Sequence, residues 1–516
     1  MRHLEKQRAK RQLPIGAEEF PEAELSGGVP RQEGRLHRHG NASIMRPLME
    51  GPASHDDRPP ISVAGAIRVG DGVRHVASTN PRAGAAGRLG YLVTSFPRVS
   101  ETFIINEIIE LERQGFDLRI YSMTAPTDRI RHRLVDEIRA PIRYLPKPLS
   151  PSIGTVLADH AWLMARSPRA YALTLFRVVT SGERDLIARF PQAPCLARML
   201  GRDGVTHVHA AFVHMPGSLA YIVHLLTGRR YSLGTHARDL YHSPPALLRK
   251  KLAAARVVFT CTRYNVSHLQ RLSADAGAFR VRQVYHGTTL ERFTFEPCGR
   301  SEPPVVLAVA RLVEKKGLED LIEASALLRD RGVRFRCHIV GHGELRKSLT
   351  GLIHRLDLHQ FVTLEGAADQ DEVLSWYRRA TVLALPCRVA RDGDRDGIPN
   401  VLIEAAACGL PIISTPVCGI PELVTDRVSG LLVSPQHPVA LARAIKLLLH
   451  SLELRERLRV NARKRVEETF DVRRNALAIG RELRAVMEPP PKETARTHAR
   501  GTEPVSTTNQ MSTEAR

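Results

Sequence analysis

Short apolar runs of strand length alternate with segments of helical spacing along most of this sequence. Residues 88–94 and 117–123 are two such runs, and residues 103–114 between them carry apolar side chains at helical intervals. A strand, a helix and a second strand form the unit that builds parallel sheets. The alternation pauses at a Ser-Glu-Pro-Pro segment, residues 301–304, and resumes with the run 305–312. We therefore predict an α/β protein with two Rossmann-like domains that face a cleft.

The domain limits follow from where the alternation begins, pauses and stops. A chain of 516 residues is too long for one hydrophobic core. We place a first domain at residues 87–298 and a second domain at residues 299–470. Residues 1–86 and 488–516 are rich in polar residues and proline and lack periodic apolar runs, so we expect both tails to be disordered.

The composition narrows the class of protein and its compartment. No window of about 18 uninterrupted apolar residues occurs, and no apolar segment follows the basic residues 1–11, so we expect neither a spanning helix nor a signal peptide. The seven cysteines are scattered without a CxxC pair, which is typical of buried thiols in a reducing cytoplasm. We therefore expect a cytoplasmic protein without a zinc site.

The net charge of +21 requires a partner or an explanation. Nucleic acid, an anionic membrane surface and phosphate-bearing small molecules are the candidate partners, and a general arginine bias is the alternative. Basic residues are spread over the whole chain and aromatic residues make up only 5%, which argues against nucleic acid. Residues 152–180 combine helical apolar spacing with Arg166, Arg169 and Arg177. This stretch suits either peripheral contact with the inner face of an anionic membrane or an ordinary buried helix pair.

The first candidate site motif is AVARLVEKKG at residues 308–317. Arg311 and Lys316 follow a predicted strand and flank the start of a predicted helix. Arginine offers a planar pair of donors, lysine offers a compact charge, and a helix N-terminus also favours anions. The arrangement suits a diphosphate, although two ordinary surface residues would give the same pattern.

Two further motifs follow later strands of the same predicted domain. Gly341 and Gly343 end a strand in HIVGHGEL and would let the backbone approach a ligand. In DGIPNVLIE, Asp396 and Glu404 bracket a predicted helix start at Pro399 or Asn400. One acid could accept hydrogen bonds from ribose hydroxyls and the other from sugar hydroxyls. Helix capping by Asp396 and a solvated Glu404 are the structural alternative.

A histidine and an acid stand out in the first domain. His236 ends a predicted strand in YSLGTHARDLYH, and Asp239 follows three residues later. A pair of this kind at the carboxyl end of a strand suits the positioning of a hydroxyl. His207, His209 and His214 are the candidate metal ligands, but no clear carboxylate accompanies them, so we expect no metal site.

Taken together, these motifs resemble those of a known family. ARLVEKKG, IVGHGEL and DGIPNVLIEAAACGLPIISTPVCGIPELV are similar to the nucleotide-sugar domain of glycosyltransferase family 4, whose members are retaining enzymes with the GT-B fold. YLVTSFPRVSETFIINEIIEL and GTHARDLYH resemble the first domains of exopolysaccharide, colanic-acid-type members. The resemblance covers most of residues 88–487. It implies a final helix at residues 471–487 that returns to the first domain.

The resemblance also implies roles for individual residues. Arg311 and Lys316 would grip the donor diphosphate, and Glu404 would contact its ribose. Asp396 would be the first acid of the family's E-x7-E motif, and His236 would be the acceptor-domain histidine, with Asp239 beside it. We take His236, Arg311, Lys316 and Asp396 as the catalytic residues. The other donor-binding residues that the resemblance implies are Gly341, Gly343, Gly397, Ile398 and Pro399.

Three departures from the family pattern leave the sugar undetermined. Asp396 stands where the family has the longer glutamate. Residues 287–289, Gly-Thr-Thr, replace the usual Gly-Val-Asp. The sequence SFPRVSET after the first strand replaces a Gly-Gly loop.

The resulting hypothesis is a retaining transfer of a hexosyl unit from a nucleoside diphosphate sugar to a glycan or lipid-linked hydroxyl in exopolysaccharide or envelope glycan biosynthesis. Arg311 and Lys316 would stabilise the leaving diphosphate, so no metal or other cofactor is expected. Residues 392–394, DGD, are then expected to be solvated. A non-catalytic nucleotide-sugar-binding scaffold is the main alternative. A dehydrogenase is disfavoured because no GxGxxG follows either first strand with an acid about 20 residues later.

Overall fold

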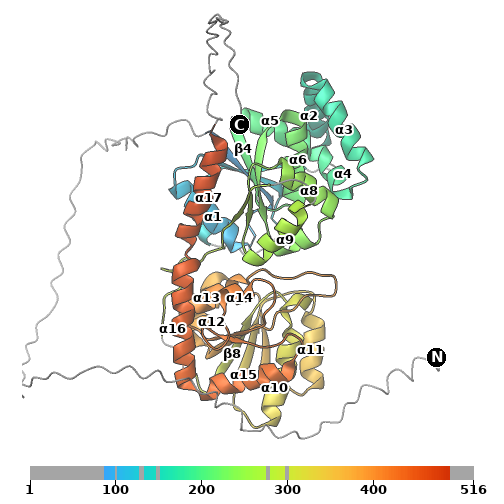
Figure 1. Ribbon diagram of the computed structural model, residues 1–516. Coiled ribbons are helices and arrows are strands. Elements are labelled where there is room, and N and C mark those ends of the chain that lie inside the picture. The colour runs from blue at the N-terminus through green and yellow to red at the C-terminus, as the bar shows by residue number, and fades with distance from the viewer. Residues whose placement is uncertain are drawn as a thin grey trace, which may run out of the picture. The chain divides into compact units, whose positions relative to one another are not determined.

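The computed structural model describes residues 87–98, 101–126, 133–146, 152–274, 279–296 and 301–488. The tails that the sequence predicts to be disordered, residues 1–86 and 488–516, lie outside the described residues except for Glu488, and Cys298 lies outside them too. The described chain forms two α/β domains, each built around one parallel sheet (Figure 1). The predicted fold class of two Rossmann-like domains is therefore confirmed, while the cleft that they were predicted to face stays a prediction.

The first domain is built on a seven-stranded sheet in the order β3-β2-β1-β4-β5-β6-β7, and all its pairings are parallel. Its strands are β1 (Arg88–Ser95), β2 (Leu118–Thr124), β3 (Ile142–Tyr144), β4 (Val205–Ala210), β5 (Arg230–Thr235), β6 (Val258–Thr260) and β7 (Val281–Gln283). Its helices are α1 (Thr102–Arg113), η2 (Arg133–Glu137), α2 (Ile153–Arg166), α3 (Pro168–Thr180), α4 (Arg184–Arg189), η3 (Phe190–Gln192), α5 (Ala193–Arg202), α6 (Met215–Thr227), α7 (Ala237–Tyr241), α8 (Pro245–Ala254) and α9 (Arg263–Ala274).

The second domain is built on a six-stranded parallel sheet in the order β10-β9-β8-β11-β12-β13. Its strands are β8 (Val305–Val309), β9 (Arg336–Val340), β10 (Val362–Gly366), β11 (Val382–Ala384), β12 (Ile412–Ser414) and β13 (Leu431–Leu432). The helices are η4 (Glu314–Lys316), α10 (Leu318–Asp330), α11 (Arg346–Arg355), α12 (Gln370–Arg379), α13 (Asn400–Cys408), α14 (Ile420–Leu423), α15 (Pro438–His450) and α16 (Leu452–Thr469), and α17 (Val472–Met487) follows them.

Both sheets reverse their strand order beside their first strand, between β1 and β4 and between β8 and β11. In such sheets ligands bind outside the carboxyl ends of the strands at this point of reversal. The two places where a ligand site is expected are therefore fixed by topology: the loops after β1 and β4, and the loops after β8 and β11.

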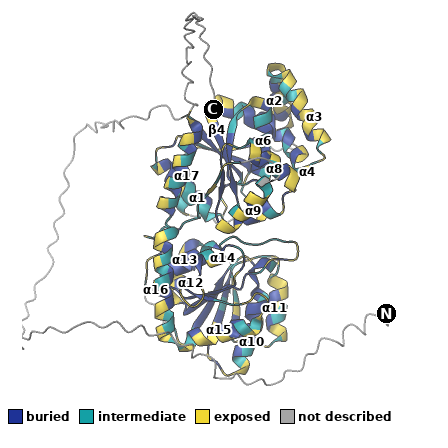
Figure 2. Cartoon of the chain, in the orientation of Figure 1, coloured by how far each residue is buried: buried dark blue, intermediate teal, exposed yellow. Residues whose placement is uncertain are grey.

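The strands lie in the interior of the domains because their sequences are continuous apolar runs. All five residues of β8, VVLAV, are buried, as expected for a parallel strand covered by helices on both faces. Figure 2 shows the buried residues concentrated in the sheets and on the inner sides of the helices. Five of the six described cysteines are also buried, in agreement with their apolar sequence context.

Helices α16 and α17 carry the chain from the second domain back to the first. α16 packs against α13 of the second domain, and α17 packs against α1 of the first. Leu483, Ile479 and Val486 of α17 are buried in the same apolar cluster as Ile104 and Ile108 of α1. The side chain of Asp471 caps α17 by accepting a hydrogen bond from the Arg474 N–H.

Residues 287–289 lie against the start of α17. The Thr288 N–H donates to the Phe470 carbonyl at 2.9 Å, and the Val472 N–H donates to the Thr288 carbonyl at 3.2 Å. A Cβ atom on Gly287 would lie 2.4 Å from the Val472 Cα. The departure from the family pattern at 287–289 thus lies where two backbone segments pair closely.

We expect Gly287→Ala to destabilise the protein by about 1–3 kcal/mol, because the backbone of Val472 cannot move aside as a flexible side chain would. Thermal unfolding followed by circular dichroism measures the effect. Gly154→Ala in α2 is the matched control, since nothing lies within 4 Å of the added methyl group. An unfolding midpoint equal to that of the control would contradict the close pairing.

Candidate functional site

The loops after β8 and β11 meet at the carboxyl edge of the second sheet. The chain leaves β8, passes Arg311 and forms the short helix η4, and Gly317 then adopts a left-handed conformation before α10. A Cβ atom on Gly317 would lie 2.0 Å from the Pro386 carbonyl oxygen in the loop after β11. The Arg388 N–H donates to the Lys315 carbonyl at 2.9 Å and ties the same two loops together.

Two buried lysines and two partly buried aspartates form a charged cluster at this junction. Lys316 Nζ lies 2.6 Å from Asp396 Oδ2, and Lys315 Nζ lies 3.1 Å from Asp394 Oδ1 and 3.2 Å from Asp396 Oδ1. The side chains of Lys315 and Lys316 are only 5% and 9% exposed. The sequence motifs at 308–317 and at 392–404 are therefore brought together through Lys316 and Asp396.

Lys316 and Asp396 are ionised because their opposite charges offset the cost of burial. Burial alone would raise the pKa of the Asp396 carboxyl, but the ammonium groups of Lys316 and Lys315 outweigh burial and hold that pKa well below its usual range. Burial lowers and Asp396 raises the pKa of Lys316, and the net shift is upward. Removing one member would leave an opposite charge buried without its full complement of partners.

The structure corrects one prediction and qualifies another. The DGD segment was expected to be solvated, but Asp394 turns inward to Lys315, and only the Asp392 side chain is largely exposed, at 65%. Lys316 was expected to face a diphosphate, and it already contacts Asp396. The side chain of Arg311 is exposed and makes no hydrogen bond or ion pair with any residue that the structure describes.

The two glycines after β9 lie against the loop that follows β8. Gly341 has φ +146°, and a Cβ atom there would lie 1.8 Å from the Ala310 carbonyl oxygen. A Cβ atom on Gly343 would lie 2.4 Å from the Leu312 carbonyl oxygen. Close backbone packing therefore explains both glycines without a ligand, and it also fixes the position of the loop that carries Arg311.

The helix start between the two acids forms as predicted, with Pro399 as the N-cap of α13. The Gly397 carbonyl accepts a hydrogen bond from the Gly419 N–H, and Ile398 packs on the core of the domain.

Glu404 lies inside α13 and is buried, where its Oε2 accepts a hydrogen bond from the Tyr377 hydroxyl at 2.9 Å. Burial raises the pKa of the Glu404 carboxyl, and Tyr377 partly opposes that shift.

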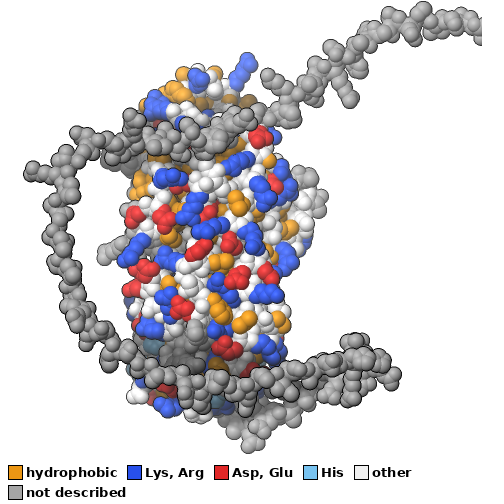
Figure 3. Space-filling view, turned by 90° about the vertical axis from the view of Figure 1, so that its left-hand side faces the viewer, with side chains coloured by type: hydrophobic (Ala, Val, Ile, Leu, Met, Phe, Trp, Pro, Cys, Tyr) orange, Lys and Arg blue, Asp and Glu red, His pale blue; other side chains and the backbone are white. Residues whose placement is uncertain are grey.

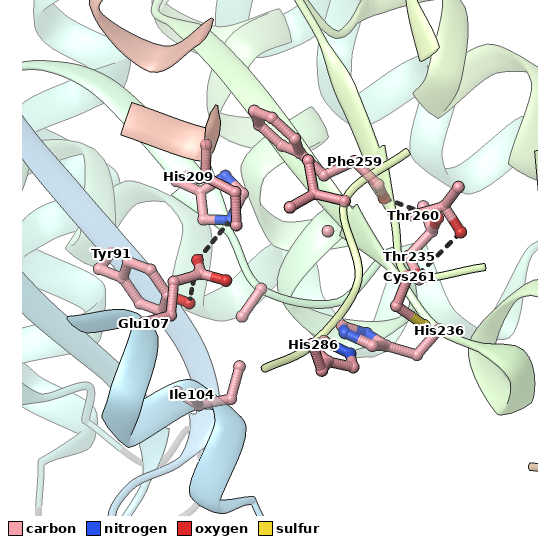
Figure 4. A pocket seen from close by; sticks show the side chains of 14 residues that line it. Tyr91, Ile104, Glu107, His209, Thr235, His236, Phe259, Thr260, Cys261 and His286 are labelled. Carbon is pink, nitrogen blue, oxygen red and sulfur yellow. Dashed lines mark hydrogen bonds and ion pairs between the residues drawn. The ribbon is translucent and has the colours of Figure 1, made fainter. Parts of the chain in front are cut away.

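The first domain holds a small cavity of mixed polar and apolar lining beyond the ends of its central strands (Figure 4). The cavity has a volume of about 30 Å³, enough for a water molecule. Its polar lining includes Tyr91, Glu107, His209, His236 and His286. His236 and His286 stack with ring centroids 5.0 Å apart, and Figure 4 shows them on one side of the cavity with Glu107 and Tyr91 on another.

The predicted pair of His236 and Asp239 forms a capping box at the start of α7. Asp239 Oδ1 accepts from the His236 N–H and Oδ2 accepts from the Val213 N–H, both at 2.7 Å. Asp239 therefore holds the backbone on which His236 stands. Burial, with smaller contributions from His286 and His209, holds the pKa of His236 well below its ordinary value, so the ring is neutral. The buried Nδ1 of this ring has no hydrogen-bond partner among the described residues.

Glu107 is a residue of this cavity that was not predicted from the sequence. It lies on α1 among buried isoleucines, and its Oε1 accepts a hydrogen bond from the Tyr91 hydroxyl at 2.8 Å and lies 3.7 Å from His209 Nε2. Burial raises the pKa of Glu107 to about 7, whereas burial lowers the pKa of His209 to about 3. An acid on the apolar face of the predicted helix 103–114 was the available signal.

Comparison with known proteins finds a family match in the second domain. Residues 292–465 match the model of the family described as glycosyl transferases group 1. The match includes Arg311, Lys316, Asp396 and Glu404, so the charged cluster at the carboxyl edge belongs to the matched segment.

Two curated relatives extend the similarity beyond this matched segment. The chain is 27% identical over 418 residues to the putative colanic acid biosynthesis glycosyltransferase WcaL of Escherichia coli K12, which covers 78% of this chain and 99% of the relative. It is 29% identical over 390 residues to the amylovoran biosynthesis glycosyltransferase AmsK of Erwinia amylovora, which covers 69% and 89%.

Solved structures show the GT-B fold. A sucrose-phosphate synthase from Thermosynechococcus elongatus superimposes with a TM-score of 0.61 at 21% identity, covering 77% of this chain and 99% of that one. Anabaena Alr3699/HepE in complex with UDP-glucose superimposes with a TM-score of 0.59 at 17% identity, covering 77% and 100%.

Metal-ligating groups and surface charge are the two features of the described residues that concern cofactors and partners. The described part of the chain contains no group of three or more His, Cys, Asp or Glu side chains placed to hold a metal ion. Figure 3 shows Lys and Arg interleaved with Asp and Glu on the face that carries α16 and α17, without one dominant basic patch on that face.

We expect the stability of Glu107→Gln to depend on pH differently from that of the wild type. The pKa of Glu107 is about 7 in the folded chain against an ordinary 4.5, so between these values the folded state binds more protons than the unfolded state. Wild-type stability should therefore fall relative to the variant as pH rises through this window, by on the order of 3 kcal/mol.

Urea unfolding of both proteins at a series of pH values measures this difference, since shifts of the surrounding histidines are common to both. Parallel stability curves would show that the Glu107 carboxyl ionises as it does in water.

Proposed function

We propose that this protein is a retaining glycosyltransferase of extracellular polysaccharide biosynthesis. It transfers a hexosyl unit from a nucleoside diphosphate sugar to a hydroxyl of a glycan or lipid-linked acceptor in the cytoplasm. The observation that carries the proposal is the cationic group of Arg311 and Lys316 at the carboxyl edge of the domain that matches the group 1 family. The names of the relatives support the biosynthetic setting, since both are polysaccharide biosynthesis glycosyltransferases.

The donor diphosphate binds beside the end of β8. The exposed Arg311 guanidinium offers two parallel donors to phosphate oxygens. Lys316 supplies a second cation, and Asp396 keeps it charged and directed. The first N–H groups of α13, which begins at Asn400, add main-chain donors at the same edge of the sheet. Glu404 accepts from the ribose, while Gly341, Gly343 and the 397–399 turn shape the site.

The reaction needs charge stabilisation rather than an enzymic nucleophile. The bond between the anomeric carbon and the phosphate oxygen breaks, and the acceptor oxygen bonds to that carbon on the same face. The acceptor proton passes to the departing phosphate oxygen. Arg311 and Lys316 stabilise the negative charge that develops on the diphosphate, and this is the task that a divalent metal would otherwise perform.

The neutral imidazole of His236 directs a sugar hydroxyl on the acceptor side. Its buried Nδ1 is without a partner among the described residues, its ring stacks on His286, and Asp239 holds its backbone. Asp239 acts only through His236, because both of its carboxylate oxygens already accept backbone N–H groups.

We expect Lys316→Ala to lower kcat by about 100-fold or more, as the loss of one transition-state donor does in other enzymes. The fold should persist because Lys315 remains 3.2 Å from Asp396. The activity is measured as nucleoside diphosphate release, with the active donor first found from a panel of nucleotide sugars by thermal shift.

Arg336→Ala is the matched control, because Arg336 is an exposed cation at the opposite, amino end of β9. It should leave kcat within about twofold, as surface substitutions generally do. A folded Lys316→Ala protein with wild-type kcat would overturn the proposal. Donor binding without any turnover in the wild type would instead favour the non-catalytic scaffold.

We expect the product to keep the anomeric configuration of the donor, and turnover to be insensitive to chelation by EDTA. Proton NMR of the first product formed identifies the anomer. An inverted product would refute retention, and loss of activity in EDTA that added metal restores would refute metal independence.

A further inference from the structure

The connection between β3 and β4 holds more chain than a parallel crossover needs. A crossover between two parallel strands of one sheet usually requires a single helix. Here α5 packs on β4, whereas α2 packs on α5 and α3 packs on α6. Helices α2 and α3, residues 153–180, therefore form an additional outer layer, which we call the α2–α3 hairpin (Figure 1).

The outer face of this hairpin is apolar. Seven of the eighteen large apolar side chains that are exposed in the described chain belong to these 28 residues. The most exposed are Phe176 at 67%, Leu157 at 62% and Val179 at 60%. The other four are Leu173, Ile153, Met164 and Leu175.

The exposed apolar residues lie away from the buried side of each helix. In α2, Ile153, Leu157 and Met164 are spaced by four and seven residues and line one side, while Val156 and Leu163 are buried on the other. In α3, Phe176 and Val179 are exposed, and Thr174 and Val178 are buried. The helices are thus not the buried pair that the sequence also allowed, since each has an inner face and a second, uncovered apolar face (Figure 2).

The charge of the hairpin is entirely positive at its surface. Arg166, Arg169 and Arg177 are all exposed. The one acid between residues 152 and 180 is Asp159, which is buried and lies 2.6 Å from Arg198. The outer face therefore offers apolar side chains and guanidinium groups without a carboxylate.

Exposed apolar side chains together with arginines indicate which kind of partner the hairpin binds. An anionic bilayer offers an apolar interior for the side chains and phosphates for the guanidinium groups. A second copy of the same face would bring arginines against arginines with no acid to pair them. α2 and α3 have 14 and 13 residues, too few to cross a bilayer, and no helix among the described residues is long and apolar enough to do so.

We propose that the α2–α3 hairpin lies in the surface of an anionic membrane, with Leu157 and Phe176 inserted among the acyl chains. Arg166, Arg169 and Arg177 contact lipid phosphates around them. This contact does not depend on the proposed function. Where that function holds, the hairpin keeps the enzyme at the surface from which a lipid-linked acceptor is presented.

Vesicle flotation of the full-length protein tests the proposal without any sugar substrate. The probes are vesicles of phosphatidylcholine alone and vesicles with about 30 mol% phosphatidylglycerol, whose anionic surface attracts basic segments. We expect binding to the anionic vesicles, at least tenfold weaker binding to the neutral ones, and loss of binding at high salt.

Two variants separate the apolar and the charged contributions. Leu157→Asp with Phe176→Asp should weaken binding at least tenfold, and Arg166, Arg169 and Arg177 replaced together by Gln should abolish the preference for anionic lipid. Leu452→Asp with Val460→Asp in α16 is the matched control, since both residues are also exposed apolar side chains. Thermal unfolding midpoints verify that all the variants fold.

Equal binding by the hairpin variants and the control would overturn the proposal. Failure of the wild type to float with anionic vesicles would overturn it as well, and concentration-dependent self-association lost in the aspartate variant would assign the face to a second copy. Because no outcome involves sugar transfer, a failed membrane contact is distinguishable from a failed enzyme assignment.

Discussion

The rest of the second domain's site depends on one buried ionic interaction, that of Lys316 and Lys315 with Asp396 and Asp394. It joins the loop after β8 to the loop after β11, the two strands beside which the sheet order reverses. Desolvation of four charges is costly, and only mutual pairing at 2.6–3.2 Å offsets that cost. The pairing keeps a lysine ammonium charged inside the protein, ready for an anionic ligand.

The two domains use the same topology for different chemistry. The carboxyl edge of the second sheet gathers fixed charges, with Arg311 exposed beside them. The corresponding edge of the first sheet gathers groups that burial keeps neutral, namely Glu107 with a pKa near 7 and histidines whose pKa values are lowered. A charged edge suits a diphosphate, and a neutral hydrogen-bonding edge suits hydroxyl groups.

Much of the fold was predictable because the spacing of apolar residues indicates which side chains are buried. The run 88–94 became β1, Arg88–Ser95, but the run 305–312 ends as a strand at Val309. Residues 310–312 instead pair with the loop around His342, a long-range contact that no local pattern encodes. Asp394 was misjudged and Glu107 was missed for a similar reason. Their partners, Lys315 and Tyr91, lie 79 and 16 residues away in sequence.

The central claim is that the cations at the end of β8 hold the diphosphate of a nucleotide sugar. The most direct measurement is a crystal structure of the protein with its nucleoside diphosphate bound. The account predicts phosphate oxygens within about 3 Å of Lys316 Nζ and of the Arg311 guanidinium. A diphosphate bound elsewhere, with Lys316 paired only to Asp396 and Arg311 directed into solvent, would contradict it.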